Sequence, residues 1–533
     1  MAIYRWFLLI VLFKNINCSI TNDIVIETNV GKIKGAKASD GDYYMYLGIH
    51  YAMVGDNPFG VSTPYPPFHD TFDAVEDTIM CPQLNKKLGL VTGITDCLRL
   101  NIYVPTSANL TNRLPVMIWL HGGRFEINYA GRAIFGPHYL VPHNIILVTV
   151  NYRLGPYGFM CLDIPEVSGN QGLKDQYLAI KWVKENIEAF GGDSNQITLF
   201  GQSAGGHSID LHLMSPRQIL FNKIILQSGS AQSLTVLYEP DKSAALKIAS
   251  YAGLQTNSTK EAIRFLSLTD VKIVIDAAKH YQIHFKPCVE AQYTNADPFI
   301  INSWINPKVP KVKNIPVLMG FNKIEYAGIF FPKKERFLSN PTTVKDHLEQ
   351  VFDFSNQQSE EAASLVSHFY FGDNKIDENT TWSLVRFLSD FTYIHPIHRT
   401  LSKYLEYGAK SVYFYMMSYV GERNMLITNN YDEYQPNDNS CCASHNDELN
   451  YLFHKENKPE MSNTDRLIME SMTTMWTNFA KYSNPTPEVS ELLPVKWEPA
   501  TKDEYSYMNI NTELTVQKRP LHQRMTFWDL FYK

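Results

Sequence analysis

Three side chains of this sequence could together carry out nucleophilic catalysis. Ser203 lies within Gly-Gln-Ser-Ala-Gly at 201–205, a G-x-S-x-G pattern, and Glu325 and His445 follow later, each after an apolar segment. A serine hydroxyl is a poor nucleophile at neutral pH, because it needs a neutral imidazole to take its proton and a carboxylate to hold that imidazole in the right tautomer. We therefore predict Ser203 as the nucleophile, His445 as its base and Glu325 as the acid that orients the base.

The residues around Ser203 favour a sharp turn between a strand and a helix. A β-prone run at 196–200 precedes the motif, and the small residues Ala204, Gly205 and Gly206 follow it. Such a turn leaves no room for side chains two positions to either side of the serine, and the helix after it points N–H groups at the reaction centre. Chance alone would produce the pattern in roughly one chain in ten of this length, so the motif needs its partner residues as support.

A second stretch of backbone could stabilise negative charge. The continuous apolar run at 114–120 is typical of a strand buried on both faces of a parallel sheet, and it leads into His121-Gly122-Gly123. The N–H groups of a glycine pair at this place can approach a substrate oxygen and, with the N–H of Ala204, form an oxyanion hole. A plain tight turn is the alternative interpretation.

Strand and helix patterns alternate along most of the chain, which predicts an α/β fold with a mostly parallel central sheet and helices on both faces. Nothing in the sequence marks a second folded domain. The predicted elements are a hairpin at 24–36, strands at 100–104, 114–120, 145–152, 196–200, 223–228, 315–320 and 411–416, and helices at 172–190 and 401–409.

Composition and the first residues indicate a soluble, exported protein. The chain has 533 residues and a formal net charge of −6, without a strongly basic block, which argues against nucleic acid as a partner. Residues 1–18 place a positive residue before a short apolar run, as a secretory signal does, and a buried first strand is the alternative. We predict a signal peptide at 1–18 and a single domain at 19–533. No later run is long enough to span a membrane.

Possible glycosylation sites and cysteines agree with export. Sequons begin at Asn109, Asn257 and Asn379. Six cysteines would remain after removal of the signal, and an even number suggests disulfides in an exported chain. Their pairing stays open from spacing alone, and the adjacent Cys441 and Cys442 could form a vicinal disulfide, pair elsewhere or stay reduced. No C-x-x-C motif or histidine cluster with ligand spacing favours a metal site.

With these motifs in place, the sequence resembles the type-B carboxylesterases, a family that includes the cholinesterases and insect juvenile hormone esterases, over nearly the whole mature chain. The resemblance implies a single α/β-hydrolase domain with its catalytic triad in a deep gorge, and no metal or organic cofactor. The motifs that carry it are Asp96-Cys97-Leu98-x-Leu100-Asn101, Asn151-Tyr152-Arg153, Asn170-Gln171-Gly172-Leu173-x-Asp175-Gln176, Phe190-Gly191-Gly192-Asp193, Phe200-Gly201-Gln202-Ser203-Ala204-Gly205-Gly206, Leu226-Gln227-Ser228-Gly229-Ser230 and His445-x-Asp447-Glu448-Leu449.

The same resemblance assigns expected roles to further residues. It implies that the N–H groups of Gly123, Arg124 and Ala204 form the oxyanion hole. It also implies that Ser228 supports the triad. A disulfide between Cys81 and Cys97 is expected as well.

Several positions depart from the family pattern. Arg124 stands where the family usually has Gly or Ala, so a non-glycine residue would resist a positive φ there, and its long cationic side chain could obstruct the pocket or attract an anionic group. Our hypothesis is that Arg124 narrows or redirects activity rather than abolishing it. Tyr326 also stands where the family usually has Gly after the acid, and Cys442 stands near another usual Gly. No tryptophan lies between Cys81 and Cys97, so the aromatic residue that binds the cation in cholinesterases is missing there, and a choline ester is not the expected substrate.

Taken together, these features predict a secreted serine carboxylesterase that hydrolyses a small-molecule ester through an acyl-enzyme. Gln202 is similar to the residue at this position in juvenile hormone esterases, which favours a lipophilic ester. The rival hypothesis is a catalytically weakened or inactive binding or adhesion relative on the same fold. A lipase acting at interfaces is a further enzymatic variant, and the oligomeric state is not predicted.

Overall fold

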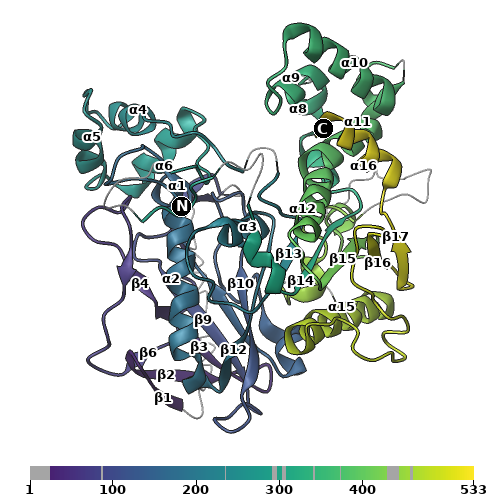
Figure 1. Ribbon diagram of the computed structural model, residues 1–533. Helices are drawn as coiled ribbons and strands as arrows, with labels where there is room; N and C mark the ends of the chain where they lie inside the picture. Colours follow the sequence, from purple (N-terminus) through teal and green to yellow (C-terminus); the bar gives the residue numbers. More distant parts are fainter. Residues whose placement is uncertain are drawn as a thin grey trace, which may run out of the picture.

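One large sheet organises the molecule (Figure 1). The computed structural model describes residues 24–532 apart from 86–87, 234–235, 291–296, 303–307, 340–341, 373, 429–442 and 457–459. Within these ranges, thirteen strands form a single sheet in the order β1-β2-β3-β9-β11-β10-β12-β13-β14-β15-β16-β17, with β6 paired to β2.

The middle of the sheet is parallel and its two margins are antiparallel. All pairings from β11 across to β16 are parallel, whereas β1, β2, β3 and β9 pair antiparallel on one side and β17 on the other. The strands are β1 (Ile24–Thr28), β2 (Gly31–Lys37), β3 (Tyr43–His50), β6 (Phe72–Asp73), β9 (Arg99–Pro105), β10 (Leu114–Leu120), β11 (Ile146–Val150), β12 (Gly192–Gln202), β13 (Lys223–Gln227), β14 (Val317–Asn322), β15 (Val412–Met417), β16 (Ser506–Ile510) and β17 (Thr515–Lys518).

Continuous apolar runs form the central strands because both faces of the sheet are covered. Along β10, Ile118 packs into one hydrophobic core, whereas Met117 and Trp119 pack into a second core on the other face. Helices α2 (Gln171–Asn186) and α3 (Ala204–Met214) contribute to the first core, and α15 (Asn463–Tyr482) contributes to the second. The predicted α/β-hydrolase fold in one large domain is therefore confirmed.

Two predicted elements differ from the structure at their ends. The helix predicted at 172–190 is α2 followed by a 3-10 turn, η3 (Ile187–Phe190), which ends at Gly191 in the left-handed region. The helix predicted at 401–409 is α12 (His395–Glu406), which starts earlier because a π-helical turn, η7 (Asp390–Ile394), joins it to α11 (Thr381–Ser389). Neither the tighter 3-10 turn at the first junction nor the wider π-helical turn at the second has a signature in a single sequence.

Two disulfides lie among the described residues. Cys81 is bonded to Cys97, and Cys161 is bonded to Cys288 across 127 residues, a pairing that the sequence left open. The predicted signal peptide at 1–18 and the pair Cys441 and Cys442 lie outside the described residues. Across the ranges that the structure covers, no helix combines the length and apolarity needed to cross a membrane.

Candidate functional site

Ser203 is at the tip of a sharp turn between β12 and α3. Its φ and ψ angles are 53° and −121°, and its N–H donates to the carbonyl oxygen of Gln227 over 2.9 Å. The flanking glycines allow this turn: a Cβ atom on Gly205 would lie 1.9 Å from the carbonyl oxygen of Leu120, and one on Gly201 would lie 2.7 Å from the same atom. Ser203 is only 7% exposed, so the turn presents the hydroxyl inside the molecule.

Glu325 and His445 form a direct pair at the same edge of the sheet. Each follows the carboxyl end of a parallel strand, β14 for Glu325 and β15 for His445, as Ser203 follows β12. Oε2 of Glu325 lies 2.7 Å from Nδ1 of His445. The other carboxylate oxygen, Oε1, accepts hydrogen bonds from the hydroxyl of Ser228 (2.6 Å) and the N–H of Asn322 (2.7 Å). Because Glu325 is fully buried and held by two donors, its free oxygen keeps the proton of His445 on Nδ1.

The opposite nitrogen of His445 faces the turn that carries Ser203. Nε2 of His445 lies 3.2 Å from the side-chain amide nitrogen of Gln202, the residue directly before Ser203. No hydrogen bond joins Ser203 and His445 within the described ranges. Hydrogen bonds of this kind are often long or unformed in unliganded enzymes. The structure thus brings all three predicted residues into one site, with Gln202 on the nitrogen that a base would use.

The predicted oxyanion loop lies against Ser203. A Cβ atom on Gly122 would lie 3.1 Å from Cβ of Ser203. Gly123, Arg124 and Phe125 follow with φ angles of 122°, 62° and 63°. The N–H groups of Gly123 and Arg124 donate no hydrogen bond within the part of the chain that the structure describes.

Ala204 supplies a third free donor to this place. It is the first residue of α3, and the first N–H groups of a helix have no carbonyl partner in the preceding turn. All three predicted donors are therefore available. Arg124 has the positive φ angle that the sequence analysis named as a possible source of strain at this position.

The π-helical turn η7 adds a residue that sequence reasoning missed. It places Tyr393 against His445, with ring centroids 4.6 Å apart. No motif singles out Tyr393, because its position depends on one wide turn far from the triad in sequence.

Two acids of the His445 motif also have structural partners. Asp447 accepts hydrogen bonds from the N–H of Ser444 and the N–H of Met425, which fixes the loop that carries His445. Glu448 is fully buried and receives a hydrogen bond from the side-chain amide of Asn322. Burial, and then the nearby charge of Glu325, raise the pKa of Glu448 to about 7. The sequence motif contained both acids but assigned them no role.

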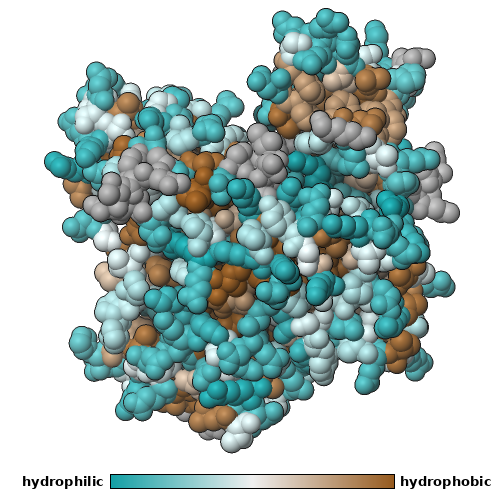
Figure 2. Space-filling view, viewed as in Figure 1, coloured by the Kyte–Doolittle hydropathy of each residue, from teal (hydrophilic) through white to brown (hydrophobic). Residues whose placement is uncertain are grey.

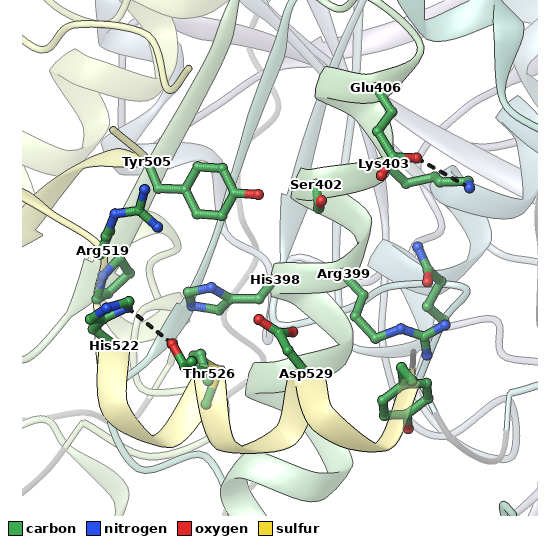
Figure 3. Close-up of a pocket in the computed structure, with 14 residues that line it drawn as sticks. His398, Arg399, Ser402, Lys403, Glu406, Tyr505, Arg519, His522, Thr526 and Asp529 are labelled. Atoms are coloured by element: carbon green, nitrogen blue, oxygen red, sulfur yellow. Dashed lines mark hydrogen bonds and ion pairs between the residues drawn. The ribbon is translucent and has the colours of Figure 1, made fainter. Parts of the chain in front are cut away.

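Two sizeable cavities open among the described residues. One, of about 880 Å³, borders the oxyanion loop and includes Arg124 and Tyr326 in its lining. The other, of about 540 Å³, lies between α12 and α16 (His522–Asp529), where His398 and Arg399 of α12 face Thr526 and Asp529 (Figure 3). Only the first adjoins the residues predicted for catalysis.

The remaining predicted sites lie elsewhere on the molecule. Asn109, Asn257 and Asn379 are all exposed, so each sequon is accessible. Among the residues with described positions, no group of three or more His, Cys, Asp or Glu side chains is arranged to hold a metal ion.

Comparison with known proteins gives a consistent set of relatives. The sequence profile described as the carboxylesterase family matches residues 22–528. The chain is 30% identical to esterase FE4 of Myzus persicae, with 95% of this chain and 92% of that protein covered. It is 31% identical to juvenile hormone esterase of Tribolium castaneum (87% and 84% covered) and 30% identical to human bile salt-activated lipase (93% and 70% covered).

A solved structure shows the same fold. The crystal structure of juvenile hormone esterase from Manduca sexta, with OTFP covalently attached, superposes with a TM-score of 0.81. Its sequence is 24% identical, and the match covers 96% of this chain and all of that one.

Proposed function

Because the chain belongs to the carboxylesterase family and is a carboxylic ester hydrolase, we propose that Ser203 is its nucleophile, His445 its general base and Glu325 the carboxylate that orients the base. The observation that carries this proposal is the 2.7 Å contact between Glu325 and Nδ1 of His445, beside a serine on a strained turn. Ser228 and Asn322 support it by holding the other oxygen of Glu325.

The reaction proceeds in two halves. Oγ of Ser203 attacks the ester carbonyl while Nε2 of His445 accepts the serine proton, and the N–H groups of Gly123, Arg124 and Ala204 donate to the oxyanion. His445 then protonates the departing alcohol. Water attacks the acyl-enzyme with the same base, and the carboxylic acid is released.

Gln202 has to change partner before the first step. Its amide occupies Nε2 of His445, the lone pair that must receive the serine proton. Substrate in the site would displace this contact and allow Ser203 to donate to His445.

The substrate is a small, largely apolar ester. The cavity beside Arg124 includes apolar side chains such as Ile275, Ile283 and Phe337. Relatives named as juvenile hormone esterase and bile salt-activated lipase support an ester of this kind.

Export of the protein is part of the proposal. Residues 1–18 have the pattern of a secretory signal, and the remaining domain would then begin near residue 19. Two disulfides and three exposed sequons support an oxidising compartment. Sequencing the amino terminus of protein collected from the medium of expressing cells tests this, because an intact Met1 on secreted protein would contradict it.

The proposed nucleophile is tested by mass spectrometry after exposure to an organophosphate. A covalent adduct on Ser203 is expected in the wild-type protein, and none in the Ser203→Ala variant treated in the same way. The adduct requires an activated serine and an oxyanion hole, so it reports the assembled site.

Absence of an adduct on folded wild-type protein would contradict the proposal. The positive φ at Arg124 and the Gln202 contact on His445 favour the rival in that case, a binding relative on the same fold. The circular dichroism spectrum of the wild-type sample would establish that the protein tested is folded.

A further inference from the structure

The cavity beside the oxyanion loop is placed to receive one part of an ester bound at Ser203. Its lining comes from the loop at Arg124, from helix α6 (Val271–His280), and from the stretch between Tyr326 and Phe337, which includes α7 (Ala327–Phe330). Arg124 belongs to the predicted oxyanion loop and Tyr326 follows Glu325, so the cavity borders residues adjacent to the predicted triad. Figure 2 shows the notch between the two groups of helices that form its walls, at the top of the view.

The charges on this lining are mostly positive. The lining has four cations and one carboxylate, namely Arg124, Lys279, Lys333, Arg336 and Glu126. Glu126 is engaged by His284, whose Nδ1 lies 2.8 Å from its Oε1. The whole chain has the opposite balance, with 54 acidic and 48 basic residues. A concentration of positive charge in an acidic protein focuses the field on this cavity.

Arg124 is the one of these four cations that belongs to the predicted oxyanion loop. Its side chain is exposed to the cavity and makes no ion pair or hydrogen bond within the described ranges. Lys279 and Arg336 likewise form no ion pair there. Burial, and next the positive charge of the Arg124 guanidinium, lower the pKa of Lys286 to about 8.

We infer that the substrate is an amphiphilic ester with an anionic group, held by Arg124 and the cations of this cavity while the ester carbonyl lies at Ser203. This inference rests on the proposed function and specifies its substrate class. The apolar side chains of the same wall, including Ile275 and Phe337, bind the rest of the molecule. Within the described ranges, a neutral ester would leave Arg124, Lys279 and Arg336 without a counter-charge, whereas a carboxylate, sulfate or phosphate group would provide one.

Two pairs of synthetic esters test the charge on each side of the carbonyl. On the acyl side, 4-nitrophenyl hydrogen adipate is compared with neutral 4-nitrophenyl hexanoate. On the alcohol side, 4-carboxyphenyl hexanoate is compared with neutral 4-acetylphenyl hexanoate. In at least one pair we expect kcat/KM to favour the anionic ester by about tenfold at about 0.01 M salt, and the preference to shrink at about 0.5 M salt because the charges are screened.

Variants of the lining cations outside the oxyanion loop test whether the preference for anionic esters arises in this cavity. Arg336→Gln and Lys279→Gln are each expected to lower the anionic-to-neutral ratio of kcat/KM by roughly threefold. Lys272→Gln is the matched control, since Lys272 is an exposed lysine of the same helix whose side chain is not part of the lining. The control is expected to keep the wild-type ratio.

The outcomes separate the inference from the function on which it rests. Hydrolysis of neutral esters at least as fast as the anionic ones, with a ratio that neither salt nor Arg336→Gln changes, would overturn the inference and leave the esterase intact. Failure of folded protein to hydrolyse any of the four esters or to form the Ser203 adduct would overturn both.

Discussion

Arg124 occupies a backbone conformation that L residues avoid. Its φ angle is 62°, and those of its neighbours Gly123 and Phe125 are also positive. The Arg124 side chain has no hydrogen-bond or ion-pair partner in the described ranges that would compensate. A residue with a Cβ atom in this region costs about 1 kcal/mol relative to glycine. The protein therefore retains an arginine at the price of some stability, beside the atoms that react.

Replacing Arg124 by glycine should stabilise the protein. We expect Arg124→Gly to raise the free energy of unfolding by about 0.5–1 kcal/mol, because glycine adopts this φ without strain and its entropy in the unfolded state offsets part of the gain. The midpoint of urea unfolding measures this. Arg124→Ala is the control, since it removes the same charge but keeps the Cβ atom, and equal stability of the two variants would refute the backbone explanation.

The residues of the site were predictable to the extent that their roles depend on local motifs. Ser203 and its glycines are a motif in themselves, and Glu325 and His445 follow strands that the apolar runs predict. The contact between Gln202 and His445 could not be predicted, because it joins positions 243 residues apart through a side-chain rotamer.

At the scale of elements, the π-helical turn η7 positions a ring on the imidazole of His445. The turn lies between α11 and α12. Ser389, the residue just before the turn, accepts a hydrogen bond at Oγ from the N–H of Tyr326. Tyr393 projects from this turn onto the ring of His445. One extra residue in a turn changes no hydrophobic pattern, so no sequence signal predicts this contact.

Tyr393 should act as a positioning residue through its ring and not through its hydroxyl. We expect Tyr393→Ala to lower kcat about tenfold by loosening the imidazole, with a smaller effect on KM, while Tyr393→Phe retains near wild-type kcat. Steady-state kinetics on 4-nitrophenyl hexanoate gives both parameters. If Tyr393→Phe were as slow as Tyr393→Ala, the hydroxyl would be the important group and the expectation would be wrong.

The disulfides join elements over very different lengths of chain. Cys161 and Cys288 are 127 residues apart, and Cys288 pairs with Tyr238 in a short bridge close to Lys286. Gly169 packs against both sulfur atoms, since a Cβ there would lie within 2.7 Å of each. This bond therefore ties the segment after Phe285, which lines the cavity, to the loop that follows α1 (Gly155–Phe159).

Loss of the two disulfides should have unequal effects on stability. Constraining a loop of 127 residues in the unfolded chain is worth about 5 kcal/mol, and one of 16 residues about 3 kcal/mol. We thus expect the double variant Cys161→Ser/Cys288→Ser to unfold at a lower urea concentration than Cys81→Ser/Cys97→Ser. The reverse order would show that local packing outweighs chain entropy at these bonds.

At the scale of the whole molecule, buried histidines and buried acids oppose one another as the pH falls. Burial lowers the pKa values of His121 and His143 to about 4 and those of His207, His212 and His398 to about 3. In the unfolded chain they would bind protons near pH 6.5, so acid favours unfolding. Burial raises the pKa of Asp447 to about 6 and that of Glu448 to about 7, so these two acids bind protons first in the folded state and work in the other direction.

These five histidines against the two acids predict a net loss of stability between pH 7 and pH 5. From the pKa values we expect the free energy of unfolding to fall by a few kcal/mol over this range. His398 packs against Phe321 and Phe414, and its Nε2 has no hydrogen-bond partner in the described structure. His398→Phe should therefore reduce the fall by about 2 kcal/mol. His69→Gln, at an exposed position, is the control, and an unchanged pH dependence in His398→Phe would contradict the explanation.

The architecture was the most predictable level, and the reason is physical. A parallel sheet covered on both faces requires continuous apolar strands, and those runs stand out at β10, β11 and β14 without any knowledge of tertiary contacts. The margins of the sheet were less apparent, because a strand as short as β6, which pairs parallel with β2, depends on a distant segment of the chain. The lining of the cavity was not predictable, since its residues come from separate parts of the chain.

The cationic cavity beside Ser203 also affects how the reaction ends. Hydrolysis of every ester releases a carboxylic acid, which is ionised at neutral pH and so carries one more negative charge than the ester group did. On the proposed mechanism this acid forms at Ser203, beside the loop that carries Arg124, so the acid is expected to dissociate slowly and to compete with fresh substrate. Progress curves should then bend before the substrate is exhausted, added hexanoate should inhibit, and salt should relieve both effects. Straight progress curves at low salt would show that the acid dissociates rapidly, and product inhibition would then be absent.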